Sequence, residues 1–414
     1  MNYKEHFDRL TEFLGPYEPL WNREILENYP QTMVPYDESW LEDLRNLSKE
    51  QLWKFDCFAD TEYLTSPSLI QVMESLKSLT KLDFFTYSKA RVFPDWAFRK
   101  VKEKKRHEIT LITAFINDLQ QVSPHAHTTD IGGGVGHLAR VLAHYYGLRT
   151  KSIDINKDFQ DIGEKRSKAF PLPEGASDLE FIHMNFLGES DAKKMKSVFT
   201  NDSLTLGLHT CGTLANSVIE THIKMKTKSL LNFGCCYLKM NPKEDTNLST
   251  YSKSTNHLEL SNWALTLASR GYTSMDFKQY LLKERVKSYR YTLQLLLNDI
   301  HGKSHFVSVG DSHPREYWAE FSEYASKKLE LLKLAPNYSL NELQEFYDDK
   351  ETKRKIKDMY LGNIIRWQFG RALEHYILTD RCLVLKEAGL KVQMKELFDE
   401  SLSPRNIGIF STLS

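Results

Sequence analysis

The chain has 414 residues, which is more than one ordinary domain needs and predicts two or three folded units. Its hydrophobic fraction of 41% is sufficient for a substantial core, and 27% of the residues are charged. The 55 basic and 55 acidic side chains cancel, which excludes a uniformly polycationic nucleic-acid coat protein but allows a local basic groove. Residues 1–100 hold 12 basic and 17 acidic side chains, so any polyanionic partner is expected to bind the later part of the chain.

The cysteine content argues against an extracellular disulfide framework. The five cysteines are odd in number, and two of them, Cys235 and Cys236, are adjacent. The first 13 residues lack the apolar core of a signal peptide, and no stretch approaches the 18 uninterrupted apolar residues of a membrane span. We therefore expect a reduced, cytoplasmic protein without a membrane partner.

The first hundred residues are expected to be helical. Apolar side chains recur at helical spacing in 40–47 and 69–79, and Ser66 and Pro67 suit the start of the second of these helices. Residues 108–122 form a clearer amphipathic pattern, with apolar side chains on one face.

After residue 125 the pattern changes to short apolar segments that alternate with helical ones. We predict strands, in chain order, at 127–131, 149–155, 179–184, 203–208, 229–237, 389–398 and 405–412. Helices are predicted between the first five, at 137–146, 158–169 and 214–226, and helical spacing returns at 258–270 and 317–334. This alternation predicts an α/β fold with a doubly wound, mostly parallel seven-stranded sheet.

The expected organisation is nested. We predict an N-terminal helical domain over 1–104, an α/β core over 105–245, a helical insertion over 246–378 and closing strands of the core over 379–414.

A glycine-rich turn, 130–136, lies between the first predicted strand and the first helix of the core. Its sequence, Asp-Ile-Gly-Gly-Gly-Val-Gly, lets the backbone turn sharply and lets a ligand approach it closely. Read from Gly134, it matches a dinucleotide fingerprint with Asp154 lying 20 residues further on, which would indicate a nicotinamide-dependent oxidoreductase. Read from Asp130, it matches the turn of methyltransferases that use S-adenosylmethionine.

The second interpretation explains more of the residues. Asp130 can accept a hydrogen bond from the methionine ammonium or order the turn, and Asp154 can accept from both ribose hydroxyls. Asn185, after the third strand, is placed to contact the adenine amine. The expected cofactor-binding residues are Asp130, Gly132, Gly134, Gly136, His137, Asp154, Asn185 and His209.

Several blocks together resemble one family. They are Lys104-Lys105-Arg106-His107-Glu108, the glycine turn with His137-Leu138, Leu208-His209-Thr210-Cys211-Gly212-Thr213-Leu214, Cys235-Cys236-Tyr237, and the closing Asp380-Arg381, Leu397-Phe398-Asp399 and Ser403-Pro404-Arg405-Asn406. The chain thereby resembles the methyltransferase-like proteins that include a ribosomal-RNA adenine dimethylase-domain protein. Thr213, Leu238 and Glu400 depart from the family pattern.

The resemblance implies a class I, Rossmann-like methyltransferase that transfers a methyl group from S-adenosylmethionine to a macromolecule. RNA is the first expected substrate and protein the second. A protein that binds the cofactor without catalysis remains an alternative. We expect Arg405 to brace the loop between the last two strands.

The expected catalytic residues are His209, Cys211, Cys236 and Tyr237, which lie at the ends of the fourth and fifth strands. His209 is either a general base or a residue that positions the loop and the acceptor. Cys211 and Cys236 occupy positions like those of the catalytic cysteines in RNA cytosine C5-methyltransferases. The alternatives are that the cysteines fill space beside the cofactor, or that they hold a metal with His209, although adjacent cysteines suit tetrahedral ligation poorly. No metal is expected.

Two further sets of residues have open roles. Lys105 or His107 is placed to approach either the cofactor carboxylate or a substrate phosphate. The alternative is that the block that contains them is only the charged start of a helix. Basic runs at 193–196, 224–228, 283–290 and 350–357 line an RNA groove or are solvated helix faces.

Overall fold

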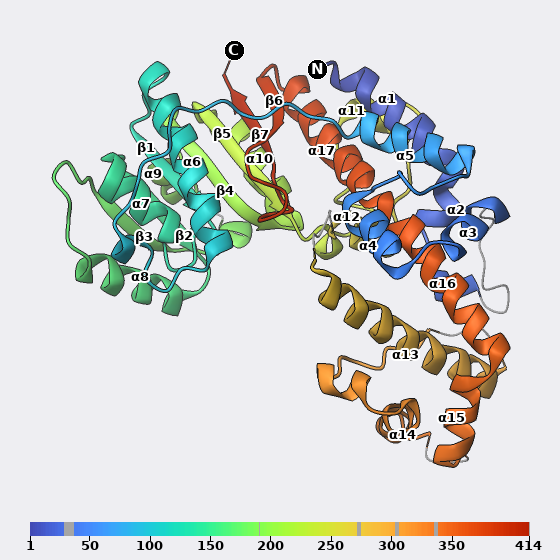
Figure 1. Cartoon of the computed structure of the whole chain (residues 1–414). Coiled ribbons are helices and arrows are strands. Elements are labelled where there is room, and N and C mark those ends of the chain that lie inside the picture. Colours follow the sequence, from blue (N-terminus) through green and yellow to red (C-terminus); the bar gives the residue numbers. More distant parts are fainter. Residues whose placement is uncertain (29–36, 190, 271–274, 303–305, 335–337, 414) are drawn as a thin grey trace. The chain divides into compact units, whose positions relative to one another are not determined.

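The computed structural model describes residues 1–28, 37–189, 191–270, 275–302, 306–334 and 338–413 (Figure 1). These residues form two compact units. Unit 1 comprises residues 1–13, 79–271 and 372–414, and unit 2 comprises residues 14–78 and 272–371. These boundaries differ from the expected domain boundaries. Unit 2 combines helices of the expected N-terminal domain with helices of the expected insertion.

Unit 1 is built on a seven-stranded sheet with the order β3-β2-β1-β4-β5-β7-β6. Its strands are β1 (His127–Ile131), β2 (Thr150–Asp154), β3 (Leu179–His183), β4 (Ser203–Cys211), β5 (Ser229–Cys235), β6 (Lys391–Glu396) and β7 (Ile407–Thr412). The first five pair in parallel, and β7 runs antiparallel to both β5 and β6. The predicted α/β class and the seven-stranded, mostly parallel sheet are confirmed.

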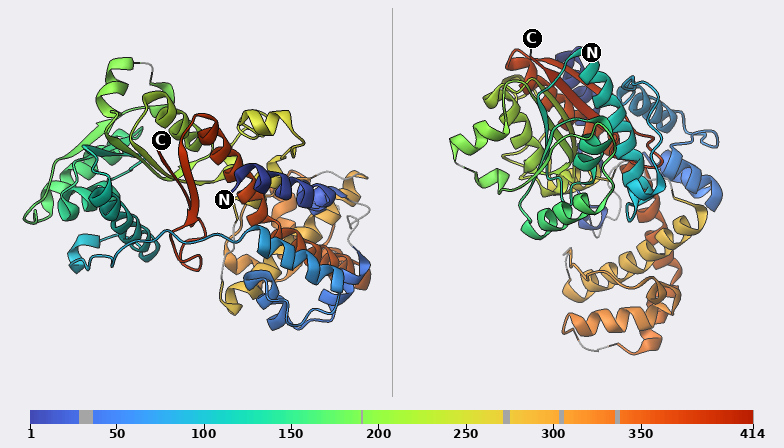
Figure 2. Two further views of the ribbon diagram at one scale, coloured as in Figure 1. Left: turned by 90° about the horizontal axis from the view of Figure 1, so that it is seen from above. Right: turned by 90° about the vertical axis from the view of Figure 1, so that its left-hand side faces the viewer.

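Helices cover both faces of this sheet (Figure 2). One face packs against α6 (Glu103–Val122) and α7 (His137–Tyr146), whose apolar side chains share a core with Leu204, Leu206 and Leu208 of β4. On the other face, the side chain of Asn232 donates to the carbonyl of Ala215 in α10 (Thr213–Met225). Successive side chains of a strand point to opposite faces of the sheet. Because helices cover both faces, the side chains on both sides of β4 and β5 are buried.

The remaining helices of unit 1 are α1 (Tyr3–Leu14), α8 (Lys157–Ala169), α9 (Ala192–Val198), α11 (Thr250–Ser254), α12 (Asn262–Ala268) and α17 (Gly370–Glu387), and its short 3₁₀ segments are η3 (Asp95–Phe98), η4 (Phe186–Gly188) and η5 (Tyr237–Lys239). Helix α17 runs across residue 378, where the sequence predicts the end of the insertion, and leads directly into β6.

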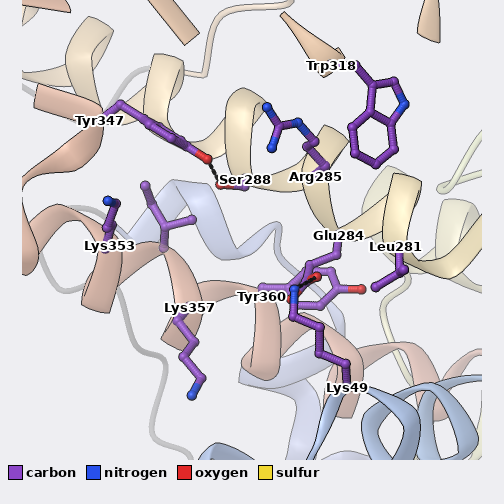
Figure 3. A pocket seen from close by; sticks show the side chains of 11 residues that line it. Lys49, Leu281, Glu284, Arg285, Ser288, Trp318, Tyr347, Lys353, Lys357 and Tyr360 are labelled. Atoms are coloured by element: carbon purple, nitrogen blue, oxygen red, sulfur yellow. Dashed lines mark hydrogen bonds and ion pairs between the residues drawn. The ribbon is translucent and has the colours of Figure 1, made fainter. Parts of the chain in front are cut away.

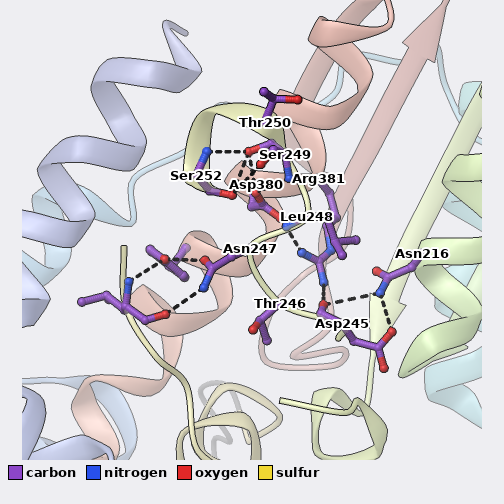
Figure 4. A network of polar contacts seen from close by, with 12 residues as sticks. Asn216, Asp245, Thr246, Asn247, Leu248, Ser249, Thr250, Ser252, Asp380 and Arg381 are labelled. Carbon is purple, nitrogen blue, oxygen red and sulfur yellow. Dashed lines mark hydrogen bonds and ion pairs between the residues drawn. The ribbon is translucent and has the colours of Figure 1, made fainter. Parts of the chain in front are cut away.

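The Asp380-Arg381 pair on α17 fixes the segment that follows β5 (Figure 4). The Asp380 carboxylate accepts from the amide of Leu248 at 2.7 Å and from the amide of Ser249 at 3.0 Å. Arg381 donates to Asp380 at 2.7 Å and also to the carbonyl of Asp245. Thr213, which stands where the family has an acid, donates to the Asp245 carboxylate at 2.8 Å. The closing helix therefore ties this segment to the start of α10.

The described residues of unit 2 form helices and the loops that connect them, without a strand. It contains η1 (Gly15–Tyr17), α2 (Glu18–Trp21), η2 (Ile25–Asn28), α3 (Glu38–Arg45), α4 (Lys49–Phe58), α5 (Pro67–Leu79), α13 (Phe277–His301), η6 (Pro314–Trp318), α14 (Phe321–Leu331), α15 (Leu340–Asp348) and α16 (Lys350–Gln368). Arg45 of α3 forms a two-pronged ion pair with Asp358 of α16, at 2.8 and 2.9 Å. Across both units, none of the helices among the described residues is long and apolar enough to span a bilayer.

Candidate active site

The carboxyl ends of the parallel strands bring the predicted site residues to one edge of the sheet. Ile131 at the end of β1 pairs with Ile153 of β2 and with Gly207 of β4. Strand β4 continues beyond this level until Cys211 pairs with Cys235, the last residue of β5. Ligands of doubly wound folds bind at this edge, so its geometry decides which ligand it suits.

The glycine turn is held by Asp154 at the end of β2. One carboxylate oxygen of Asp154 accepts from the amide of Gly134 at 2.9 Å, and the other accepts from the amide of Asn156 at 2.8 Å. Gln160 donates to the carbonyl of Gly134 at 2.8 Å. Each oxygen of Asp154 retains a second lone pair, which is what a pair of ribose hydroxyls requires.

The glycines of the turn have two different roles. At Gly134, φ is +59°, and an added Cβ would meet none of the described residues within 4 Å, so the backbone faces an open space. At Gly136, φ is +68°, and an added Cβ would lie 2.5 Å from Cε1 of Phe181. Gly134 therefore belongs to an open cradle that suits a ligand, whereas Gly136 permits close packing of the turn on β3.

Asp130 lies buried beneath the turn. The pKa of its carboxyl is raised to about 7, mainly by burial; Lys105 opposes this shift, and the nearby Asp154 adds to it. Near neutral pH, such a group changes its charge easily, and a cationic ligand group would favour its ionised form. The acid, the open cradle and the Asp154 oxygens together fit S-adenosylmethionine, whose methionine ammonium and ribose hydroxyls need these partners.

Two further predicted cofactor residues lie around the turn. His137 begins α7 and is half-buried, and burial lowers its pKa to about 4, so that the ring is neutral at pH 7. Asn185 is exposed and follows β3, whose last residue His183 pairs with Asp154. The contacts of His137 and Asn185 with the cofactor stay predictions.

His209 lies at an irregular point of β4, where the register shifts between Leu208 and Thr210. Its φ is +61°, a left-handed conformation that a non-glycine residue adopts rarely. The Nε2 atom lies 2.9 Å from both carboxylate oxygens of Glu108, near the start of α6. The irregularity thus turns the imidazole toward α6.

Glu108 is completely buried, and it is surrounded by positive charge and hydrogen-bond donors. Ser403 donates to it at 2.7 Å, and the ammonium groups of Lys104 and Lys105 lie at 3.9 and 3.7 Å. Burial raises the pKa of this carboxyl, but the hydrogen bond and charge of His209, together with Lys105 and Ser403, outweigh burial and lower it. Glu108 is therefore a carboxylate at neutral pH.

The sequence singles out Glu108 only as a member of the Lys104–Glu108 block and gives it no role. The available signal is its spacing, because lysines three and four residues earlier on a helix lie on the same face. Of the two residues expected to approach the cofactor, Lys105 lies close enough to Asp130 to affect its charge. His107 instead accepts a hydrogen bond at 3.2 Å from the amide of Asp399, so it holds the C-terminal loop.

Three cysteines meet at the ends of β4 and β5. The Sγ atoms of Cys211 and Cys235 are 3.3 Å apart, and all three sulfurs, including that of Cys236, lie within 4.8 Å of one another. The hydrogen bond from Cys235 lowers the pKa of Cys211 to about 5 even though burial opposes the shift. The pKa of Cys235 and that of Cys236 are raised, so Cys211 is the most acidic of the three thiols.

Tyr237 and Arg405 meet at a buried carboxylate of α17. The Tyr237 hydroxyl donates to Glu374 at 3.2 Å, and the Arg405 guanidinium lies 3.2 Å from the same oxygen. Arg405 also donates to the carbonyl of Ala268. Arg405 lies in the loop between β6 and β7, and its guanidinium anchors this loop to the buried Glu374 of α17 and to Ala268.

Comparison with known proteins agrees with this geometry. Residues 104–243 match a family model described as a methyltransferase domain. A mouse protein named probable methyltransferase-like protein 25 is 24% identical over 222 residues, which are 49% of this chain and 36% of that protein. Its human counterpart is 24% identical over 220 residues, with the same shares. The chain thus spans about a third of the length of these curated relatives.

Two solved structures with a similar fold are more distant in sequence. Magnesium protoporphyrin IX methyltransferase from Synechocystis PCC 6803, with bound S-adenosylmethionine, is 12% identical and has a TM-score of 0.25, with 48% of this chain and 77% of that chain covered. Coclaurine N-methyltransferase, bound to N-methylheliamine and S-adenosylhomocysteine, is 11% identical and has a TM-score of 0.28, with 100% and 95% covered. These scores are too low for either structure to inform the site.

The family match decides between the two cofactors considered from the sequence, because it describes a methyltransferase and not a nicotinamide-dependent enzyme. The chain thus carries a class I methyltransferase domain of the kind that binds S-adenosylmethionine, and it is distantly similar to methyltransferase-like protein 25.

Proposed function

We propose that this protein transfers a methyl group from S-adenosylmethionine to RNA. Two observations that agree with each other support methyl transfer. Residues 104–243 match a methyltransferase domain, and the Asp154 carboxylate accepts from the Gly134 amide in the glycine turn. Bound S-adenosylmethionine supplies the methyl group, and the protein has to align it with the acceptor for in-line displacement. His209 and Glu108 then belong to the acceptor side of the site.

RNA as the acceptor is supported by a cavity in unit 2 (Figure 3). Two of the four basic runs singled out in the sequence, 283–290 on α13 and 350–357 on α16, contribute to this single cavity of about 550 Å³. Its lining has four basic side chains and one acidic one, Glu284; the basic side chains are Lys49, Arg285, Lys353 and Lys357. A surplus of positive charge in a concave surface attracts the phosphates of a nucleic acid.

Aromatic side chains accompany these charges. Trp318 and Tyr347 line the cavity, and Trp318 is 58% exposed, which is unusual for so large an apolar ring. The Arg285 guanidinium lies 5.2 Å from the Trp318 ring centre and donates to the carbonyl of Ala319. An exposed ring beside a fixed cation provides a stacking surface for an unpaired base, so single-stranded RNA fits this cavity better than a duplex.

The first experiment measures methyl transfer directly. The purified protein is incubated with tritiated S-adenosylmethionine and with separate RNA and protein fractions of cells. Label in the RNA fraction supports the proposal, and label in the protein fraction alone replaces RNA by the second candidate. Binding of S-adenosylmethionine without label in either fraction supports a cofactor-binding protein that does not catalyse transfer.

The second experiment tests the cavity. Lys353→Ala with Lys357→Ala removes two positive charges, and Lys278→Ala with Lys327→Ala removes two exposed charges that do not line the cavity. We expect the first pair to raise the Kd for a single-stranded RNA oligonucleotide about tenfold and to reduce its dependence on salt by roughly 0.7 for each lost phosphate contact. Trp318→Ala should weaken binding without changing the salt dependence. Equal effects of the two lysine pairs would contradict the cavity as the RNA site.

A further inference from the structure

The three cysteines at the ends of β4 and β5 converge on one point. Cys211 and Cys235 are the last residues of these strands and pair with each other in the sheet, with their Sγ atoms 3.3 Å apart. Cys236 follows directly, and its sulfur lies within 4.8 Å of both. In the part of the chain that the structure describes, no other group of three or more cysteine, histidine or acidic residues brings its donor atoms together in this way.

The conformation of Cys236 makes this convergence possible. Neighbouring residues of a strand point to opposite faces, so adjacent cysteines are ordinarily poor joint ligands. Cys236 has a φ of +51°, in the left-handed region, and begins a turn of 3₁₀ helix at the end of β5. This strained conformation brings its sulfur to the sulfurs of Cys211 and Cys235. Strain of this kind concentrates at functional sites.

The surroundings suit a cation held by thiolates. Cys235 is buried, and Cys211 and Cys236 are half-buried, so the cluster is open on one side. The backbone of Lys239 packs against Gly212, where an added Cβ would lie 2.9 Å from its carbonyl oxygen. Lys239 is close enough to affect the charge of Cys211 and of Cys236. A bound metal displaces the protons of the three thiols, and the resulting three thiolates and one ammonium carry a charge of about −2, which a divalent cation balances.

We propose that Cys211, Cys235 and Cys236 form a binding site for Zn²⁺ in which the fourth ligand position stays open to an external ligand. Donor sets of thiolates alone favour zinc or copper(I) over calcium and magnesium, which prefer oxygen. Zn–S bonds of about 2.3 Å in a tetrahedron place sulfurs about 3.8 Å apart. The sulfurs of Cys211 and Cys235 are 3.3 Å apart and all three lie within 4.8 Å of one another, so small side-chain rotations complete the geometry. Three protein ligands with an open position are typical of catalytic zinc sites.

Metal binding is tested on the full chain, purified without oxygen and with a phosphine reductant. After removal of bound metal, Zn²⁺ is titrated in competition with a chromophoric chelator, and Co²⁺ is added separately to record the absorption of thiolate–cobalt bonds. We expect one Zn²⁺ per chain and a tetrahedral cobalt spectrum. Cys211→Ser and Cys236→Ser should each weaken Zn²⁺ binding by at least about 100-fold, since even indirect partners of a metal cost 10- to 100-fold.

The matched control is Cys57→Ser, which removes a thiol from unit 2 and should leave Zn²⁺ binding unchanged. Binding of S-adenosylmethionine by each variant shows that its core is folded. Zn²⁺ binding by the wild type that is no tighter than binding by Cys236→Ser would overturn the site. Recovery of a Cys211–Cys235 disulfide peptide from a chain that binds no zinc would overturn it as well. The zinc content does not depend on methyl transfer, so the proposed function and this site can fail separately.

Discussion

The Nε2 atom of His209 lies 2.9 Å from both carboxylate oxygens of Glu108, although 101 residues separate them in the chain. A neutral imidazole in this contact carries its proton on Nε2, which leaves the lone pair of Nδ1 as the proton acceptor. A buried carboxylate that fixes the tautomer and orientation of a histidine is a recurring arrangement in catalysis. Glu108 thus fixes the orientation of the His209 imidazole.

Glu108→Gln should destabilise the protein at pH 7 by roughly 1–3 kcal/mol, because it removes a charge-assisted hydrogen bond to a buried group. The folded-state pKa of Glu108 is lowered, so its contribution is present above the ordinary carboxyl pKa of about 4.3. This contribution is lost as the pH falls through the folded-state pKa. Calorimetric melting of wild type and variant should therefore show a difference at pH 7 that shrinks below about pH 4.

Glu164→Gln provides the control for this series. Glu164 forms an exposed helical ion pair with Lys168 at 2.7 Å, and such pairs contribute about 0.5 kcal/mol or less. A stability difference for Glu108→Gln that stays constant from pH 8 to pH 3 would show that the ionised carboxylate is not what stabilises the fold.

Asp130 should make cofactor binding depend on pH. Its pKa is raised to about 7 in the protein without ligand, and the ammonium of S-adenosylmethionine favours the ionised carboxylate. Affinity should therefore be constant above about pH 7.5 and should fall up to tenfold for each pH unit below 7. Isothermal titration calorimetry between pH 5.5 and 8.5 measures this directly.

Two comparisons separate Asp130 from other groups that titrate in this range. Adenosine lacks the methionine ammonium, so its affinity should not follow the same curve. Asp130→Asn should bind S-adenosylmethionine more weakly, and its affinity should be nearly independent of pH. A steep pH dependence that persists in this variant would assign the effect to another group.

Gly134→Ala should weaken binding of S-adenosylmethionine at least tenfold, because the new methyl group enters the open cradle of the turn. The positive φ of 59° adds a destabilisation of about 1–2 kcal/mol. Gly302→Ala is a matched control, since its φ is +63°, an added Cβ meets none of the described residues within 4 Å, and it lies in unit 2. It should lower the melting temperature by a similar amount and leave binding unchanged. Equal binding by both variants would place the cofactor elsewhere.

The fold was predictable where the evidence is local in the sequence. Each predicted strand of the sheet exists, and β1 and α7 have the predicted ends, because the glycine turn and Gly147 mark them directly. The composition of unit 2 was not predictable. Residues 14–78 pack with residues 272–371, and a helix with an apolar face does not specify which distant helix covers that face.

The candidate site also has features that the sequence predicts and features that it does not. The sequence predicts that Asp154 ends the second strand and lies at the same edge of the sheet as the glycine turn, but it does not specify that the carboxylate accepts from the amide of Gly134. The Glu108–His209 pair was not predictable, because it depends on a left-handed residue in β4. The sequence likewise argues against the cysteine cluster, because Cys235 and Cys236 are adjacent and cannot ligate the same metal unless one of them leaves the strand conformation.

Tyr237→Phe tests whether a predicted catalytic residue is instead part of the core. Its hydroxyl is buried and donates to Glu374. Burial and the charge of Glu374 raise the pKa of Tyr237 well above 10, so the hydroxyl stays protonated at neutral pH. Loss of this one hydrogen bond should cost about 1 kcal/mol in urea unfolding, because Glu374 retains Arg405. Cofactor affinity and the rate of methyl transfer should change less than threefold. Tyr87→Phe, at an exposed tyrosine, should change neither property. If the rate of methyl transfer fell more than 100-fold while the stability stayed the same, Tyr237 would have to be a catalytic residue.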